Sequence, residues 1–201
     1  MFQLVQTKRA HFVFEQLWGD FCEERNLTFV ERNLNPSRYL LVGEGERYIG
    51  TVECARYENP AESNAEFFYP FSQNRLVTEL SGKRVFEIGK LSISKYFRGR
   101  GHFKRLAVVL FIHALEQRAD WYLAVVTKRM YMYLRSLGFQ IEPIDEPFPF
   151  HETLMGVPVR LNAWQGMKYL YSLKEFRDVI LATPRAQQLL QENETRIRLS
   201  R

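Results

Sequence analysis

The chain has 201 residues, of which 46% are hydrophobic and 14% aromatic, so it can bury a substantial core and fits one domain of ordinary size. Its net charge of +5, from 28 Lys and Arg against 23 Asp and Glu, is a mild excess that speaks against a nucleic-acid-binding domain with its dense basic stripe. No stretch approaches the roughly 18 uncharged apolar residues of a membrane helix, and the first thirty residues lack the pattern of a secretory signal.

Two cysteines, Cys22 and Cys54, lie in candidate helix and strand runs and have no metal-ligand spacing. We interpret them as buried thiols rather than as a disulfide or a zinc site, and we expect no bound metal. Buried thiols suit a reducing compartment. We therefore expect a cytoplasmic protein. Because its basic excess is mild and it has no long apolar stretch, we expect neither a nucleic-acid nor a membrane partner.

The first half of the chain predicts a helix and a hairpin. Residues 8–25 place apolar side chains at helical spacing. Two strand-like runs around residues 38–58 are joined by a Gly-Glu turn, a pattern typical of a hairpin. Residues 59–82 are less regular, with a polar loop followed by a stretch that can include a helix interrupted at Pro70.

The second half predicts strands that alternate with helices. The run VFEIGKLSIS is a strand, FKRLAVVLFIHALEQ a helix, and WYLAVVT a short buried strand. The next helix, KRMYMYLRSLGF, closes at Gly138, because glycine readily adopts the left-handed turn after a helix. Next come two further strands, which a proline-rich loop separates, and then the helical run YLYSLKEFRDVIL.

We place one boundary near residue 182, between a mixed α/β body at 1–182 and a polar helix or tail at 183–201. Thr183 is a suitable N-cap, and Pro184 occupies the first helical position. There is no internal repeat and no low-complexity tract.

The loop RGRGHF, residues 98–103, has the features of a phosphate site. A loop that enters a helix offers unpaired N–H groups, and the helix dipole favours an anion there. Gly99 and Gly101 let the backbone approach a phosphate closely, and Arg98 and Arg100 can pair with one. A basic turn on a solvated surface is the alternative interpretation.

The segment LSISKYFRGRGHFKRL resembles the acyl-CoA-binding segment of the GNAT superfamily of N-acyltransferases. Leu91 and Ile93 match the end of the family's strand, and Arg98 and Gly101 match its Arg/Gln-x-x-Gly-x-Gly/Ala loop. Phe103 departs from the pattern, since glycine or alanine is usual there. The resemblance covers roughly residues 38–140, because WYLAVV and YLRSLGF also correspond to family elements.

This resemblance implies an α/β fold with a mixed, mostly antiparallel sheet, helices on both faces, and a splay between the strands ending near Ile93 and Val126. It implies that acyl-CoA or acetyl-CoA is the co-substrate, with its pantetheine arm in the splay and an amine as acceptor. The implied cofactor-binding residues are Leu91, Ile93, Arg98, Gly99, Arg100, Gly101, His102 and Phe103.

A narrower resemblance links residues 87–93, EIGKLSI, to the Glu-x-Ser-Arg/Lys-Leu/Phe-x-Val stretch of acyl-homoserine-lactone (autoinducer) synthases and the related N-acyl amino acid synthases. Gly89 replaces the serine of that stretch. Acetyltransferases of the superfamily often use a tyrosine at the position that is Leu134 here, and we expect the neighbouring Tyr131 and Tyr133 to be packing residues.

Glu87 is the candidate general base. Strand alternation predicts that it shares an apolar face with Val85, Gly89, Leu91 and Ile93. Burial there would raise its pKa toward the range in which a carboxylate accepts a proton from an ammonium group. Gly89 would leave room for a substrate. The alternative is a structural ion pair between Glu87 and a cation such as Lys90 or Arg56.

Other candidates have weaker signals. We expect His113 in the core, His11 on the surface, and His151 as a substrate contact. No His, Asp, Glu or Cys set has metal spacing, and no Ser-His-Asp or Cys-His arrangement is evident. The aromatic run FFYPF, together with Phe148 and Phe150, lines either an acyl pocket or the core.

Three functions are compatible with these patterns. The first is an N-acyltransferase that uses acyl-CoA or an acyl carrier protein as donor, in the manner of an autoinducer synthase. The second is an acetyl-CoA-dependent N-acetyltransferase acting on a small amine. The third is a non-catalytic member that binds acyl-CoA as a ligand. A homodimer is compatible with all three, and the sequence does not identify the acceptor.

Overall fold

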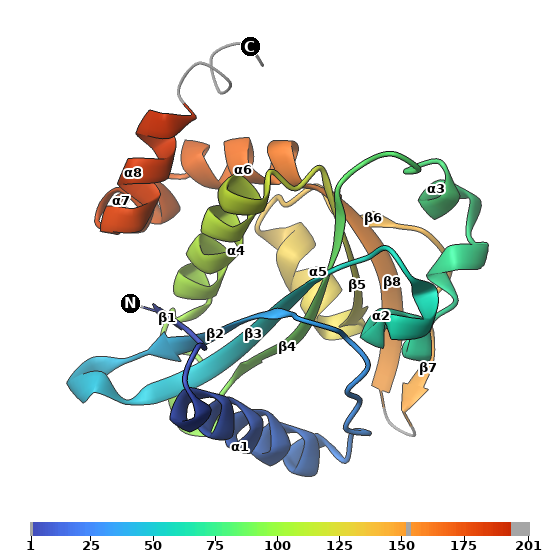
Figure 1. Ribbon diagram of the computed structural model, residues 1–201, viewed down its shortest axis with the longest axis horizontal. Coiled ribbons are helices and arrows are strands. Elements are labelled where there is room, and N and C mark those ends of the chain that lie inside the picture. The colour runs from blue at the N-terminus through green and yellow to red at the C-terminus, as the bar shows by residue number, and fades with distance from the viewer. Residues whose placement is uncertain (1, 152–153, 194–201) are drawn as a thin grey trace.

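The computed structural model describes residues 2–151 and 154–193. One sheet runs through it in the order β1-β2-β3-β4-β5-β8-β6, with β7 also paired to β8 (Figure 1). Within the described residues β4 and β5 are parallel and the other pairs antiparallel. The strands are β1 (Phe2–Leu4), β2 (Ser37–Val42), β3 (Tyr48–Arg56), β4 (Val85–Ile93), β5 (Trp121–Thr127), β6 (Glu142–Pro143), β7 (Phe148–His151) and β8 (Leu154–Asn162).

Helices cover both faces of this sheet, as expected (Figure 1). The face that carries α1 and α2 is called the α2 face below, and the opposite face, covered by α4, α5 and α6, is called the α4 face. The helices are α1 (Lys8–Arg25), α2 (Asn64–Phe68), α3 (Arg75–Thr78), α4 (Phe103–Gln117), α5 (Lys128–Ser136), α6 (Ala163–Ser172), α7 (Lys174–Leu181) and α8 (Pro184–Glu192).

The largest core lies between the α4 face of the sheet and α4. Nine of the fifteen residues of α4 are buried, because a helix that is apolar nearly all round must be covered on most sides. Helices α6, α7 and α8 complete this core, and Ala186 and Leu189 of α8 are 0% and 3% exposed. The expected boundary near residue 182 therefore lies between α7 and α8, which share a core, and residues 194–201 of the expected polar helix or tail lie outside the described residues.

Strands β4 and β5 diverge after a short contact. Residues Val85–Glu87 of β4 pair with Trp121–Leu123 of β5. Strand β4 then continues to Ile93 and β5 to Thr127. Beyond Glu87 and Leu123, the two facing edges make no ladder with each other. The splay expected from the family resemblance is therefore present.

A bulge in β4 corrects the expected alternation of side chains. The β3–β4 register shifts between Thr51 and Glu53, and Lys90 has a positive φ of 47°. One extra residue moves the following side chains to the other face. Leu91 and Ile93 consequently pack toward α4, together with Phe86 and Ile88, whereas Glu87 and Lys90 lie on the α2 face.

Candidate active site

The loop at residues 98–103 forms a cradle of free N–H groups at the end of the splay. Gly99 and Gly101 have positive φ of 74° and 77°, and α4 begins at Phe103 without a side-chain cap. In the described part of the chain, the N–H groups of residues 99–103 have no backbone or side-chain acceptor. Such a cradle at a helix N-terminus suits a phosphate group.

Arg98, expected to bind phosphate, is engaged within the protein. Its Nε donates to the Ile93 carbonyl at 2.8 Å, and its Nη2 donates to a carboxylate oxygen of Glu24 at 2.7 Å. Arg100 differs, because its guanidinium lies 5.9 Å from the centre of the Phe97 ring and pairs with no acid among the described residues. Arg100 is therefore the arginine that is free for an anion.

His102 and Phe103 occupy the start of α4. Burial first, then the charges of Arg105 and Arg100, lower the pKa of His102, so its imidazole is neutral at pH 7. The Phe103 ring packs edge-on against Tyr133 of α5, with ring centres 5.5 Å apart. The residue that departs from the family pattern thus contributes to packing between α4 and α5.

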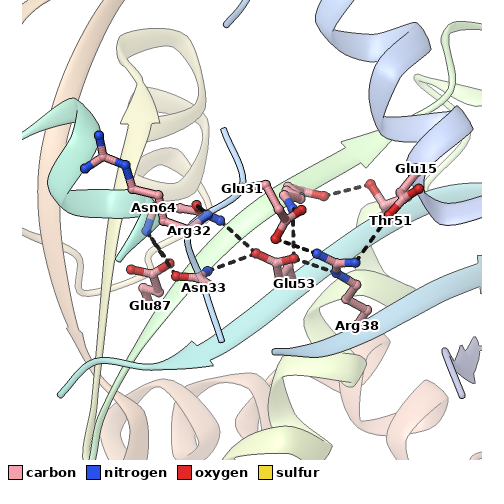
Figure 2. Close-up of polar contacts among 10 residues, drawn as sticks. Glu15, Glu31, Arg32, Asn33, Arg38, Thr51, Glu53, Asn64 and Glu87 are labelled. Carbon is pink, nitrogen blue, oxygen red and sulfur yellow. Dashed lines mark hydrogen bonds and ion pairs between the residues drawn. The ribbon is translucent and has the colours of Figure 1, made fainter. Parts of the chain in front are cut away.

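Buried charged and polar groups on the α2 face form one network around Glu53 (Figure 2). Glu53 is fully buried and accepts hydrogen bonds from Arg38 Nε at 2.7 Å and Lys90 Nζ at 3.0 Å. The side-chain amides of Asn33 and Asn64 also donate to it, at 2.9 and 3.0 Å. The two cations and two amides together offset the cost of burying this carboxylate.

The same network fastens the segment before β2 over the sheet. Glu31 accepts from Arg38 Nη2 at 2.7 Å and from Lys90 Nζ, and the Arg32 N–H donates to Asn64 Oδ1 at 2.7 Å. Sequence reasoning missed this cluster. The available signal was Glu53 itself, a carboxylate between the apolar residues Val52 and Cys54 of β3. Arg38 lies opposite it in the hairpin register.

Glu87 is 2% exposed and lies against the N-terminus of α2. It accepts hydrogen bonds from the Ser63 hydroxyl and from the N–H groups of Asn64 and Ala65, both at 3.2 Å. Burial raises its pKa, as expected, and hydrogen bonds from Ser63 and Asn33 act in the opposite direction. These donors are neutral.

The two cations considered as partners of Glu87 bind other acids. Lys90 binds Glu31 and Glu53, although the bulge brings it to the same face as Glu87. Arg56 Nε lies 2.9 Å from Glu58. The structural ion pair that was the alternative for Glu87 is therefore absent at these two residues.

Gly89 leaves open space beside Glu87. A Cβ atom built at Gly89 would meet no heavy atom within 4 Å. Gly89 pairs with Glu53 in the sheet, so this space lies on the α2 face.

The backbone groups of β4 that face β5 follow from the pairing at the start of the strand. The Arg84 backbone carbonyl accepts a hydrogen bond from the Trp121 N–H of β5. Because every second residue of a strand faces the same neighbour, the Ile88 N–H and C=O also point toward β5.

The two aromatic runs meet on the α2 face. The Phe68 and Phe150 ring centres are 5.0 Å apart, and those of Tyr69 and Phe148 are 5.8 Å apart. A Cβ atom at Gly156 would lie 3.0 Å from Phe150 and from Val125 of β5. The cluster therefore reaches the strand that borders the splay, which keeps both interpretations, acyl pocket and core, open.

The histidines mostly follow expectation. His113 is 1% exposed and its Nδ1 lies 2.7 Å from the Tyr122 hydroxyl, and His11 is exposed. His151 Nδ1 is buried without a hydrogen-bond partner among the described residues, and its role as a substrate contact stays a prediction.

The two tyrosines of α5 that were expected to be packing residues, Tyr131 and Tyr133, differ in exposure. Tyr131 packs against a core cluster, as does Leu134, so the position where acetyltransferases often have a tyrosine holds a packing residue. Tyr133 is 45% exposed.

Both cysteines are free and buried, as expected. The described residues contain no group of three or more His, Cys, Asp or Glu that could hold a metal ion, and no described helix is long and apolar enough to cross a membrane.

No family model and no curated protein matches the chain, but solved structures do. FeeM, an N-acyl amino acid synthase from uncultured soil microbes, has a TM-score of 0.65 at 12% identity over 88% of this chain and 96% of FeeM. BjaI, a CoA-dependent acyl-homoserine lactone synthase, has a TM-score of 0.59 at 15% identity, covering 80% of this chain and 79% of BjaI. A Lactobacillus plantarum protein described as an N-acetyltransferase has a TM-score of 0.59 at 12% identity, covering 81% and 97%. The chain therefore has the GNAT N-acyltransferase fold.

Proposed function

We propose that the chain is an N-acyltransferase that moves an acyl group from an acyl-CoA thioester to an amine. The observation that carries this proposal is the divergence of β4 from β5 beyond Glu87, next to a loop whose five consecutive N–H groups, residues 99–103, have no acceptor in the described protein. A thioester donor with a pyrophosphate at one end and amides along its arm complements both features.

The donor would lie along the splay. Its pyrophosphate would bind the N–H groups of residues 99–103, aided by the free guanidinium of Arg100. Its pantetheine amides would add to the unpaired strand edges, in the way a further strand would. The Ile88 N–H, directed toward β5, is a candidate donor to the thioester carbonyl, where negative charge develops during attack.

Glu87 would act as the general base. The acceptor enters over Gly89 as an ammonium ion and transfers one proton to the carboxylate, because only the free amine is nucleophilic. Its nitrogen then bonds to the thioester carbon, the carbon–sulfur bond breaks, and the thiolate leaves as a thiol with the second proton that the attacking nitrogen loses. Positioning supplies much of the rate enhancement, and the raised pKa of Glu87 favours proton acceptance at neutral pH.

The fold likeness to FeeM and BjaI supports a donor longer than acetyl and an autoinducer-synthase-like reaction. An acyl carrier protein would present the same phosphopantetheine arm and is retained as an alternative donor. Mass spectrometry of CoA species that copurify with the protein tests the donor. Acyl groups longer than acetyl support this proposal, acetyl-CoA alone supports a plain N-acetyltransferase, and retention of no CoA species even after incubation with acyl-CoA contradicts both.

A non-catalytic acyl-CoA-binding protein is the second candidate function. Two observations favour it: Glu87 already accepts three hydrogen bonds, and Leu134 occupies the position of the usual tyrosine. Release of free CoA separates the two functions. An enzyme releases thiol in proportion to added amine, whereas a binding protein is stabilised against heat by CoA but releases none.

A further inference from the structure

Arg98 is held by three groups that belong to two other elements. Its Nε binds the carbonyl of Ile93, the last residue of β4, and its terminal nitrogens bind both carboxylate oxygens of Glu24 near the end of α1. Its guanidinium also lies 5.4 Å from the centre of the Phe21 ring of α1. A bidentate pair with a stacked ring fixes the direction of a guanidinium as well as its position.

Helix α1 also touches the polar network of the α2 face. The Arg38 guanidinium lies 5.2 Å from the centre of the Phe14 ring and 3.8 Å from Glu15, and Arg38 in turn binds Glu53. The helix thus contacts the donor loop through Glu24 and the Glu53 network through residues 14 and 15. One rigid element spans the two halves of the proposed site.

We propose that Glu24 and Arg98 form a clamp that positions the phosphate loop against α1, and that Arg98 acts through this clamp and is not itself a phosphate ligand. The inference rests on the proposed function, since it assumes that the loop binds the donor phosphates. The clamp accounts for all the nitrogens of Arg98, whereas the N–H groups of residues 99–103 and the Arg100 guanidinium remain available for the anion.

Two other roles for Arg98 predict different results when Glu24 loses its charge. If a phosphate competes with Glu24 for Arg98, Glu24→Gln frees the guanidinium and CoA binds more tightly. If the pair is an incidental surface contact, nothing changes, since many exposed pairs contribute little. Under the clamp, Glu24→Gln loosens the loop and CoA binds more weakly. The sign of the change therefore separates the three cases.

The experiment compares the dissociation constants of CoA and of pantetheine, which lacks the nucleotide and the pyrophosphate, by calorimetry. We expect Glu24→Gln to weaken CoA binding about fivefold, the scale of a partly exposed charged pair, and to leave pantetheine binding unchanged. Glu23→Gln is the matched control, because it makes the same change at the neighbouring exposed residue of α1.

A double-mutant cycle completes the test. Arg98→Gln should weaken CoA binding and add little to Glu24→Gln, whereas Arg100→Gln should add its full effect to Glu24→Gln. Tighter or unchanged CoA binding in Glu24→Gln, or equal losses for CoA and pantetheine, overturns the clamp. The unmodified protein is measured first. If it binds CoA no better than pantetheine, the assignment of residues 98–103 as a phosphate loop is wrong, independently of the clamp.

Discussion

At the scale of single residues, Glu87 lies between two opposing influences. Removal from water raises its pKa, and the N–H groups of Asn64 and Ala65, at the positive end of α2, favour the ionised form. The net effect is a raised pKa, which favours acceptance of a proton from a substrate ammonium. The free space at Gly89 lies on the same face, where such a cation could approach.

We expect Glu87→Gln to lower the rate of acyl transfer by about 10²-fold or more, the usual scale for a positioned base. CoA affinity should barely change, because residues 98–103 are untouched. The loss should shrink as pH rises, since the free amine then becomes abundant without a base. Thiol release as a function of pH measures all of this.

The control for Glu87→Gln is a circular dichroism and thermal unfolding comparison, because glutamine replaces one acceptor oxygen with a donor beside the α2 N–H groups. A folded variant with near wild-type turnover at pH 7, or a loss that stays constant up to high pH, would assign Glu87 to the structure and leave the reaction without an identified base.

His113 predicts a pH dependence of stability. Burial lowers its pKa from 6.5 to about 4, so the unfolded chain binds more protons than the folded one between these values. Stability contributed by neutral His113 is therefore present above pH 6.5 and lost as pH falls toward 4, by about 3 kcal/mol at most. His113→Asn should lower the free energy of unfolding at pH 7 and reduce its decline between pH 7 and 4.

Urea unfolding at several pH values measures the effect of His113, and His11→Asn, at an exposed position, is the control. Parallel stability curves for the wild type and His113→Asn over this range would show that the buried imidazole does not supply the pH dependence.

At the scale of elements, the bulge in β4 determines the chemistry of the α2 face. Without it, Lys90 would point toward α4 and the Glu53 carboxylate would lose one of its two cations. The left-handed backbone at Lys90 costs about 1–3 kcal/mol for a residue other than glycine. The ion pairs of Lys90 with Glu31 and Glu53 help to stabilise that conformation, and they tie the segment before β2 to the sheet.

Glu53→Gln should therefore destabilise the protein by about 3 kcal/mol, because it leaves buried cations without their shared carboxylate. Glu79→Gln is the matched control, since Glu79 pairs with Arg75 at 3.0 Å on an exposed helix surface, where such a pair contributes less than about 0.5 kcal/mol. Chemical denaturation compares the two variants. Similar small losses for both would mean that the buried network contributes no more than a surface pair.

At the scale of the whole molecule, the C-terminal helices belong to the body of the fold. Phe176 and Ile180 of α7, with Ala186 and Leu189 of α8, are at most 3% exposed and pack in the core beneath α4. Because α4 begins at the phosphate loop, its support from α7 and α8 also steadies the proposed donor site. Lys104 adds a direct ion pair to Glu175 of α7.

Leu189→Ala should lower the free energy of unfolding by about 3 kcal/mol, the usual loss for a buried leucine. Leu181→Ala, at a leucine that is 39% exposed, should cost less than about 1 kcal/mol. Thermal and urea unfolding test both. If residues 183–201 were a separate tail, Leu189→Ala would leave the midpoint unchanged.

Local patterns along the chain predicted its helices and strands, and a family resemblance predicted how they are arranged. The alternation and length of the runs at residues 38–58, 85–94 and 121–127 predicted strands, whereas the GNAT arrangement and the splay were implied by the resemblance of the loop at 98–103 and its neighbours to that superfamily. The strands themselves depend on neighbouring residues and on backbone preferences, which a sequence displays directly. The buried state of Glu87 and the core position of His113 were predictable for the same reason.

The contents of the proposed site depended on tertiary structure. A bulge arises from the competition of two strands for register, so the position of Lys90 on the α2 face could not be obtained from alternation alone. The Glu53 network joins Asn33, Arg38 and Asn64, and the Glu24–Arg98 pair joins residues 74 positions apart. The order of residues shows which charged groups the chain carries. Which of them meet depends on three-dimensional packing, because burial and pairing involve segments that are far apart along the chain.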